Sequence, residues 1–172
     1  MSNLFTSNPA PDESALPPQH WLRYWGPVLA WALVIWIFST AVFSEAATSR
    51  WLFPLLHWLL PNASPRAIGH IHHLIRKFAH VFEYLLFSLL LLHGIRRGRP
   101  GWHLSWSLAA LGLAVLWAAS DEFHQIFVFG RGPSLRDVLI DGSGALTAQL
   151  LAAFWFARLR PSAPASQESP RP

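Results

Sequence analysis

The chain has 172 residues, of which 52% are hydrophobic and only 13% are charged, and it contains no cysteine. A soluble domain usually has about a quarter charged residues, so this composition excludes an ordinary soluble protein, a disordered chain and a disulfide-stabilised secreted module. The formal net charge of +4 comes from basic residues scattered between apolar runs. Nucleic-acid binding requires such residues on one accessible face. We therefore expect an integral membrane protein that does not bind nucleic acid.

The two ends of the chain are polar and rich in proline, and we expect disordered tails over residues 1–20 and 161–172. Residues 21–160 between them form one transmembrane domain. Four apolar stretches in this domain are long enough to cross about 30 Å of hydrocarbon as helices. They cover residues 26–43, 78–95, 102–120 and 135–155. The sequence predicts an all-α fold, an integral membrane four-helix bundle.

A short apolar segment lies between the first and second spans. Residues 51–61 form a run of only eleven residues that includes Pro54, which is typical of an interfacial segment rather than a span. Ser64 followed by Pro65 is a helix-start signal. We expect a helix to begin at Pro65 and to continue into the second span, with Gly69 as a weak point.

The basic residues predict the orientation in the membrane. With four spans, the N-terminus, the loop at 96–101 and the C-terminus share one side. That side carries the cluster of Arg96, Arg97 and Arg99, and the pair of Arg158 and Arg160 beside a span end. Lys and Arg are enriched in cytoplasmic loops, so we expect both termini to be cytoplasmic.

The ionisable residues within the spans gather at the opposite face. Successive spans alternate in direction, so the end of the first, the start of the second, the end of the third and the start of the fourth meet there. His72, Arg76, His80 and Glu83 recur at helical spacing and share one stripe. Unpaired charges at this depth are expensive and usually functional. We therefore expect them to face one another in a shared polar pocket.

The candidate ligand-binding residues of this pocket come from three spans. They are Arg76, His80, Glu83, Asp121, Glu122, Gln125, Arg131, Asp137 and Asp141. The candidate pairs are Arg76–Asp121, Arg131–Asp137 and His80–Glu122. The alternative is a buried polar network that only holds the four helices together. Simpler roles also exist for single residues. Lys77 and Arg136 can reach lipid headgroups, and Asp137 can help Ser134 cap a helix. Tyr84 can be either an interface anchor or a ligand contact.

Three ordered blocks in these residues resemble the VanZ-like family of small bacterial membrane proteins. The first is R-K-x-x-H-x-x-E-Y from Arg76 to Tyr84. The second is S-D-E-x-x-Q-x-F from Ser120 to Phe127, and the third is R-x-x-S-x-x-D followed after six residues by Gly, from Arg131 to Gly144. With the four-span pattern, the resemblance covers about residues 25–157.

The resemblance implies a bacterial cell-envelope protein of the inner membrane. The founding member is associated with low-level resistance to the glycopeptide teicoplanin, so a contribution to antibiotic resistance is one expectation. One departure is visible, because Asp141 stands where the family pattern often has Asn. An extra acid there changes either the pairing or the ligand preference.

Two functions from different classes remain open. The favoured one is binding of an anionic membrane lipid or lipid-linked cell-wall precursor, with Arg76 and Arg131 on the anion and the acids on sugar or amide groups. The other is a metal-assisted hydrolase or transferase acting on a lipid headgroup. No H-E-x-x-H or comparable spacing is present, so the sequence predicts no metal site and no cofactor. Ion-coupled transport is less favoured, because four spans without an internal repeat suit it poorly.

Overall fold

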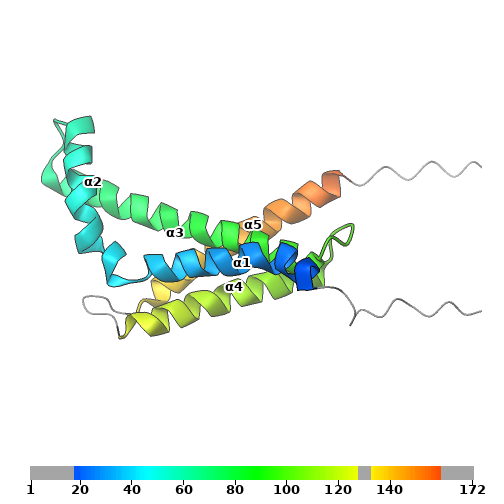
Figure 1. The fold of residues 1–172 in the computed structure, drawn as a ribbon. Coiled ribbons are helices and arrows are strands. Elements are labelled where there is room, and N and C mark those ends of the chain that lie inside the picture. Colours follow the sequence, from blue (N-terminus) through cyan, green and yellow to red (C-terminus); the bar gives the residue numbers. More distant parts are fainter. Residues whose placement is uncertain (1–17, 128–132, 160–172) are drawn as a thin grey trace, which may run out of the picture.

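The computed structural model describes residues 18–127 and 133–159. Within these ranges the chain consists of helices joined by short turns (Figure 1). The elements are α1 (Pro18–Phe38), the 3₁₀ turn η2 (Ala41–Phe43), α2 (Glu45–Leu59), α3 (Pro65–Arg96), α4 (Leu104–Gln125) and α5 (Leu135–Arg158). The expected tails fall almost entirely on residues 1–17 and 160–172, which lie outside the described residues.

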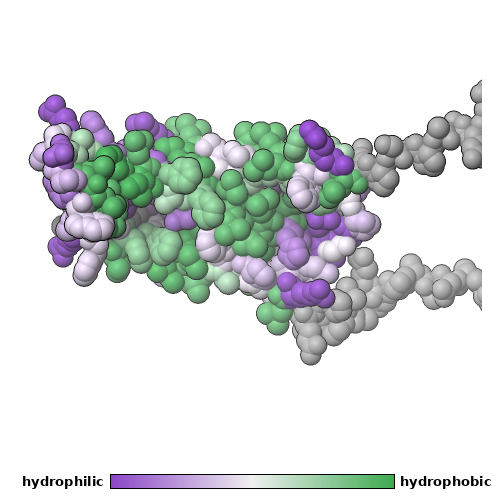
Figure 2. All heavy atoms as spheres, turned by 90° about the horizontal axis from the view of Figure 1, so that it is seen from above, coloured by the Kyte–Doolittle hydropathy of each residue, from purple (hydrophilic) through white to green (hydrophobic). Residues whose placement is uncertain are grey.

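Helices α1, α3, α4 and α5 are each long and apolar enough to cross a membrane. Large apolar side chains on them point outward, as Leu33, Leu108 and Leu150 do with more than half of their surface exposed. Figure 2 shows mostly hydrophobic surface along the middle of the bundle and hydrophilic residues at both ends. Lipid solvates such a surface, and helices satisfy their own backbone groups within it. The prediction of an all-α membrane protein with four spans is confirmed.

One end of the bundle collects the ends of several helices. Helices α1 and α4 finish there, α3 and α5 begin there, and α2 lies across it (Figure 1). We call this the α2 end. The described chain starts and finishes at the opposite end. The predicted convergence of four helix ends at one face is therefore present in the fold.

Helix α1 ends at Phe38, five residues before the expected end of the first span at residue 43. The hydroxyl of Thr40 donates to the carbonyl of Ile37 (2.7 Å), and such a side chain competes with continued helix. The chain then turns through η2 to Ser44, whose Oγ accepts from the amide of Ala47 and so caps α2. This turn is what brings α2 over the end of the bundle.

Helix α3 is the central element and touches all four other helices. It begins at Pro65, with Ser64 as its cap, and runs past Gly69 without a break, which confirms the expected continuous helix. Its 32 residues span about 48 Å, whereas the hydrocarbon core is about 30 Å thick. The first turns of α3 therefore reach beyond the core, and α2 packs against them through the buried Leu56.

Small residues let α4 and α5 pack closely within the bundle. The fully buried ones are Ala110, Ala114 and Ala118 on α4 and Ala145 and Ala148 on α5. Gly144 lies so close to α3 that a Cβ there would collide with the carbonyl of Val81. One polar contact joins the same two helices, where Nε2 of Gln149 donates to Oγ (2.8 Å) and O (3.1 Å) of Ser88. Small residues and interhelical hydrogen bonds are the usual means of helix association in membranes.

Candidate functional site

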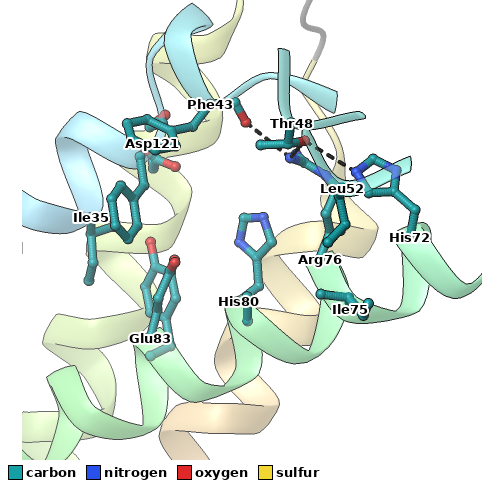
Figure 3. A pocket seen from close by; sticks show the side chains of 14 residues that line it. Ile35, Phe43, Thr48, Leu52, His72, Ile75, Arg76, His80, Glu83 and Asp121 are labelled. Carbon is teal, nitrogen blue, oxygen red and sulfur yellow. Dashed lines mark hydrogen bonds between the residues drawn. The ribbon is translucent and has the colours of Figure 1, made fainter. Parts of the chain in front are cut away.

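The polar stripe of α3 lines a cavity of about 230 Å³ at the α2 end, which we call the main cavity (Figure 3). Its walls come from α1, η2, α2, α3 and α4. The lining residues are Ile35, Phe38, Ser39, Phe43, Thr48, Leu52, His72, Ile75, Arg76, Ala79, His80, Glu83, Tyr84 and Asp121. The predicted stripe of one histidine, one arginine, a second histidine and a glutamate therefore shares one face of α3.

Arg76 is held in place by the turn that leads into α2 and by α2 itself. Its Nη1 donates to the carbonyl of Phe43 (3.0 Å) and to Oγ1 of Thr48 (3.2 Å). Oγ1 of Thr48 also lies 3.2 Å from Nε2 of the buried His72. The candidate pairing of Arg76 with Asp121 is not among the described contacts, because α2 folds over α3 and supplies closer acceptors.

His80 makes its ion-pair contact with α5. Its Nδ1 lies 3.3 Å from Oδ1 of Asp141, which is only 2% exposed. The candidate pairing of His80 with Glu122 is wrong, because the Glu122 carboxylate accepts from the backbone amide of Ser134 (2.6 Å) at the start of α5. The Glu122 carboxylate thus fixes the N-terminus of α5 to α4. Asp141 positions the imidazole of His80.

Asp121 is the contribution of α4 to the main cavity and faces Glu83 of α3 across it (Figure 3). Nε2 of Gln125, one turn later, lies 3.3 Å from Oδ2 of Asp121 and 3.4 Å from Oγ of Ser39. All of these α4 side chains are buried. Gln125 therefore ties Asp121 to the end of α1, and the carboxylate remains at the cavity.

Asp137 forms an ion pair with Lys77, and both side chains are about three-quarters buried. Lys77 therefore makes a contact within the protein instead of only reaching headgroups. Oγ of Ser134 accepts from the amide of Asp137 (3.3 Å), as expected for the cap of α5. Arg131, the candidate partner of Asp137, lies outside the described residues.

The predicted site residues thus fall into groups. Arg76, His80, Glu83 and Asp121 line the main cavity, and Gln125 and Asp141 contact two of them. Glu122, near the end of α4, and Asp137, in the first turn of α5, both contact Ser134, the cap of α5. Within the described ranges, no group of three or more His, Asp or Glu side chains is arranged to hold a metal ion.

Sequence reasoning missed one contributor to this site, Thr48, and left the roles of two others, His72 and Tyr84, open. His72 was on the predicted stripe, but only its contact with Thr48 connects it to Arg76. Thr48 gave no signal, because nothing in the sequence fixes how α2 folds back. Tyr84 is 1% exposed and lines the cavity, so it is not an interface anchor; its position directly after Glu83 in the first sequence block was the available signal.

Comparison with known proteins agrees with this architecture. The VanZ/LLP1 family model matches residues 24–156, which include all three polar blocks and nearly all of the four membrane-spanning helices. No curated protein and no solved structure matches the chain. The family match covers most of the chain, and we conclude that the protein belongs to the VanZ/LLP1 family.

Proposed function

We propose that this VanZ-type membrane protein binds the anionic headgroup of a membrane lipid or lipid-linked cell-envelope precursor in the main cavity. The observation that carries the proposal is the fixed Arg76 guanidinium at a cavity that also contains His80, Glu83 and Asp121. Ionisable groups within a membrane are energetically expensive, and those that are present usually serve a function. A cavity at the membrane boundary, rather than a filled polar core, favours ligand binding over a purely structural network.

Arg76 is the proposed anion contact. Among the described residues only its Nη1 makes hydrogen bonds, and a guanidinium has five donors in a rigid fork. The other edge of the fork is available for a phosphate or carboxylate, which arginine binds in a bidentate geometry. Thr48 and the Phe43 carbonyl hold the side chain in place and so lower the entropy lost on binding.

Glu83 and Asp121 are proposed to bind the rest of the headgroup. Ionised carboxylates only accept hydrogen bonds, so they select hydroxyl, amide or ammonium groups on the ligand. The apolar residues Ile35, Phe38 and Ile75 in the lining of the same cavity suit the first carbons of a lipid chain. This combination of donors, acceptors and apolar surface matches a lipid headgroup better than a soluble anion.

We place the protein in the bacterial inner membrane, with both termini cytoplasmic and the α2 end extracytoplasmic. Clustered arginines at the other end, among them Arg96, Arg97 and Arg99, support this orientation. In this orientation the cavity faces the leaflet where cell-wall precursors are used. Family membership supports the further proposal that the protein contributes to glycopeptide resistance of the teicoplanin type by binding such a headgroup.

The direct test is lipid binding to the full chain, measured by native mass spectrometry in a polyoxyethylene detergent. We expect Arg76→Gln to weaken binding of phosphatidylglycerol about tenfold, the effect of losing one charge-assisted contact. Arg66→Gln is the matched control, since it removes one exposed charge from the first turn of the same helix. Equal affinity of Arg76→Gln and the unaltered protein contradicts the proposal.

The resistance proposal has its own test. Expression of the full chain in a susceptible bacterium is expected to raise the teicoplanin concentration that stops growth, and Arg76→Gln is expected to remove the increase. Membrane levels of both proteins must be equal, which quantitative blotting checks. No increase with the unaltered protein contradicts the resistance role without affecting lipid binding.

A further inference from the structure

A second cavity, of about 290 Å³, adjoins the main cavity at the α2 end. It lies among the start of α2, the first half of α3 and the start of α5. Its lining residues are Glu45, His73, Arg76, Lys77, His80, Ser134, Arg136 and Asp137. Arg76 and His80 line both cavities, so these two side chains form the partition between them. We call the second space the basic cavity.

The two cavities differ in charge. In the basic cavity, Lys77 and Asp137 neutralise each other in an ion pair. Arg76 and Arg136 then face a single remaining acid, Glu45, which leaves excess positive charge. In the main cavity the balance is reversed, because Glu83 and Asp121 face Arg76 there. The charges therefore favour an anion in the basic cavity and a hydrogen-bond donor in the main cavity.

We infer that the basic cavity binds the phosphate of a lipid whose hydroxyl- or ammonium-bearing group extends past Arg76 into the main cavity. This inference rests on the proposed function and refines it: the phosphate lies on the basic-cavity side of Arg76, and only the rest of the headgroup lies in the main cavity. Arg136 and Arg76 hold the phosphate oxygens, as guanidinium groups do elsewhere. Glu83 and Asp121 accept hydrogen bonds from the donor-bearing group.

His80 completes the partition. The contact of its Nδ1 with the buried Asp141 sets the orientation of the ring, as a carboxylate does for other functional histidines. Because His80 lines both cavities, a lipid bound in the inferred way has the bond between its phosphate and the rest of its headgroup beside the imidazole. His80 is therefore a contact for the linking oxygen.

The experiment varies the two chemical parts separately, again by native mass spectrometry of the full chain in a polyoxyethylene detergent. The probes are phosphatidylglycerol (phosphate and hydroxyls), phosphatidic acid (phosphate alone), diacylglycerol (a hydroxyl alone) and glycerol 1-phosphate (no chains). We expect phosphatidylglycerol to bind most tightly, with diacylglycerol and glycerol 1-phosphate each at least tenfold weaker. Equal affinity for phosphatidylglycerol and diacylglycerol overturns the inference, and so does equal affinity for phosphatidylglycerol and glycerol 1-phosphate.

Arg136 tests the basic cavity, because its side chain is exposed and its replacement leaves the bundle core intact. Arg136→Gln is expected to weaken both phosphate lipids about five- to tenfold and to leave diacylglycerol unchanged. Arg136→Lys keeps the charge and is expected to recover most of the loss, and Arg66→Gln is the matched control. Unchanged affinity of Arg136→Gln for both phosphate lipids overturns the inference.

Glu83→Gln tests the other side of the partition. It is expected to reduce the preference for phosphatidylglycerol over phosphatidic acid, while phosphatidic acid still binds. An unchanged preference overturns the two-part assignment. The outcomes separate the two proposals: if Arg76→Gln weakens lipid binding but Arg136→Gln does not, the proposed function stands and the basic cavity is not the phosphate site.

Discussion

Gly144 determines how closely α5 can approach the polar stripe of α3. A Cβ at this position would meet the backbone carbonyl of Val81, and backbone of a packed helix cannot move aside as a flexible side chain can. One turn before Gly144 on α5, Asp141 contacts His80 of α3. The absence of a side chain at residue 144 therefore sets the distance on which the position of His80 depends.

We expect Gly144→Ala to destabilise the protein by about 1–3 kcal/mol, the usual effect of overpacking. Thermal unfolding in detergent measures this change. Gly112→Ala on α4 is the control, because no atom lies within 4 Å of its ideal Cβ, and removing a helical glycine there is expected to be neutral or stabilising by up to about 1 kcal/mol. Equal unfolding midpoints for the two variants would show that Gly144 does not limit the helix approach.

The ion pair of Lys77 and Asp137 lies at the membrane boundary, and its contribution to the free energy of unfolding can be measured. Each side chain is about three-quarters buried, so solvent screens the pair less than it screens a surface pair. In a double-mutant cycle with Lys77→Met and Asp137→Asn, we expect a coupling energy of about 1 kcal/mol. Additive effects of the two substitutions on the unfolding free energy would mean that the contact contributes nothing.

At the residue scale, the sequence predicted positions better than partners. The stripe of His72, Arg76, His80 and Glu83 follows from helical periodicity, which fixes the face of a residue within its own helix. Partners depend on how neighbouring helices are rotated and on backbone groups, neither of which has a sequence signal. That is why Arg76 pairs with a carbonyl and a threonine instead of the expected carboxylate.

Among the elements, α2 contributes to the site although little of the helix is buried. It supplies Thr48 to Arg76 and His72, yet within α2 only Leu56 is buried. Its exposed tryptophans, Trp51 and Trp58, are more than three-quarters exposed and suit the boundary between lipid and water. The short apolar run of residues 51–61 indicated this location, but not the fold-back onto α3.

We expect Leu56→Ala to loosen α2 from α3 without unfolding the bundle. Loss of a buried leucine costs about 2–5 kcal/mol in a full core, and a smaller loss is enough to open a helix with one buried anchor. Amide hydrogen exchange over residues 45–59 measures the opening, with exchange in α4 as an internal reference. Trp58→Ala is the control, since this side chain is 77% exposed; an equal effect of the two variants would contradict the anchoring role of Leu56.

At the scale of the whole molecule, composition and hydropathy were sufficient to predict the fold. Four apolar stretches give four spanning helices, because lipid leaves a chain few other ways to satisfy its backbone. Hydropathy alone placed the boundaries less well: α1 ends early at Phe38, and the start of α3 at Pro65 followed from the Ser64 cap and not from the apolar run. Turn-forming side chains such as Thr40, rather than hydropathy, decide these boundaries.

The proposed orientation gives a simple labelling prediction, because the chain has no cysteine of its own. In spheroplasts, an impermeant maleimide is expected to label Asn62→Cys, in the turn between α2 and α3, but not Ser105→Cys, at the start of α4. Ser105→Cys is expected to react fully once the membrane is opened. The reverse pattern would place the α2 end in the cytoplasm.

The length of α3 couples both cavities to the bilayer itself. Because α3 is one unbroken helix of about 48 Å, it cannot shorten when the surrounding membrane becomes thinner. A helix in this situation changes its tilt or deforms the lipid around it, and Arg76 and Glu83 move with it relative to the plane of the headgroups. The acyl-chain length of the host lipids therefore sets how deeply the proposed binding residues are immersed.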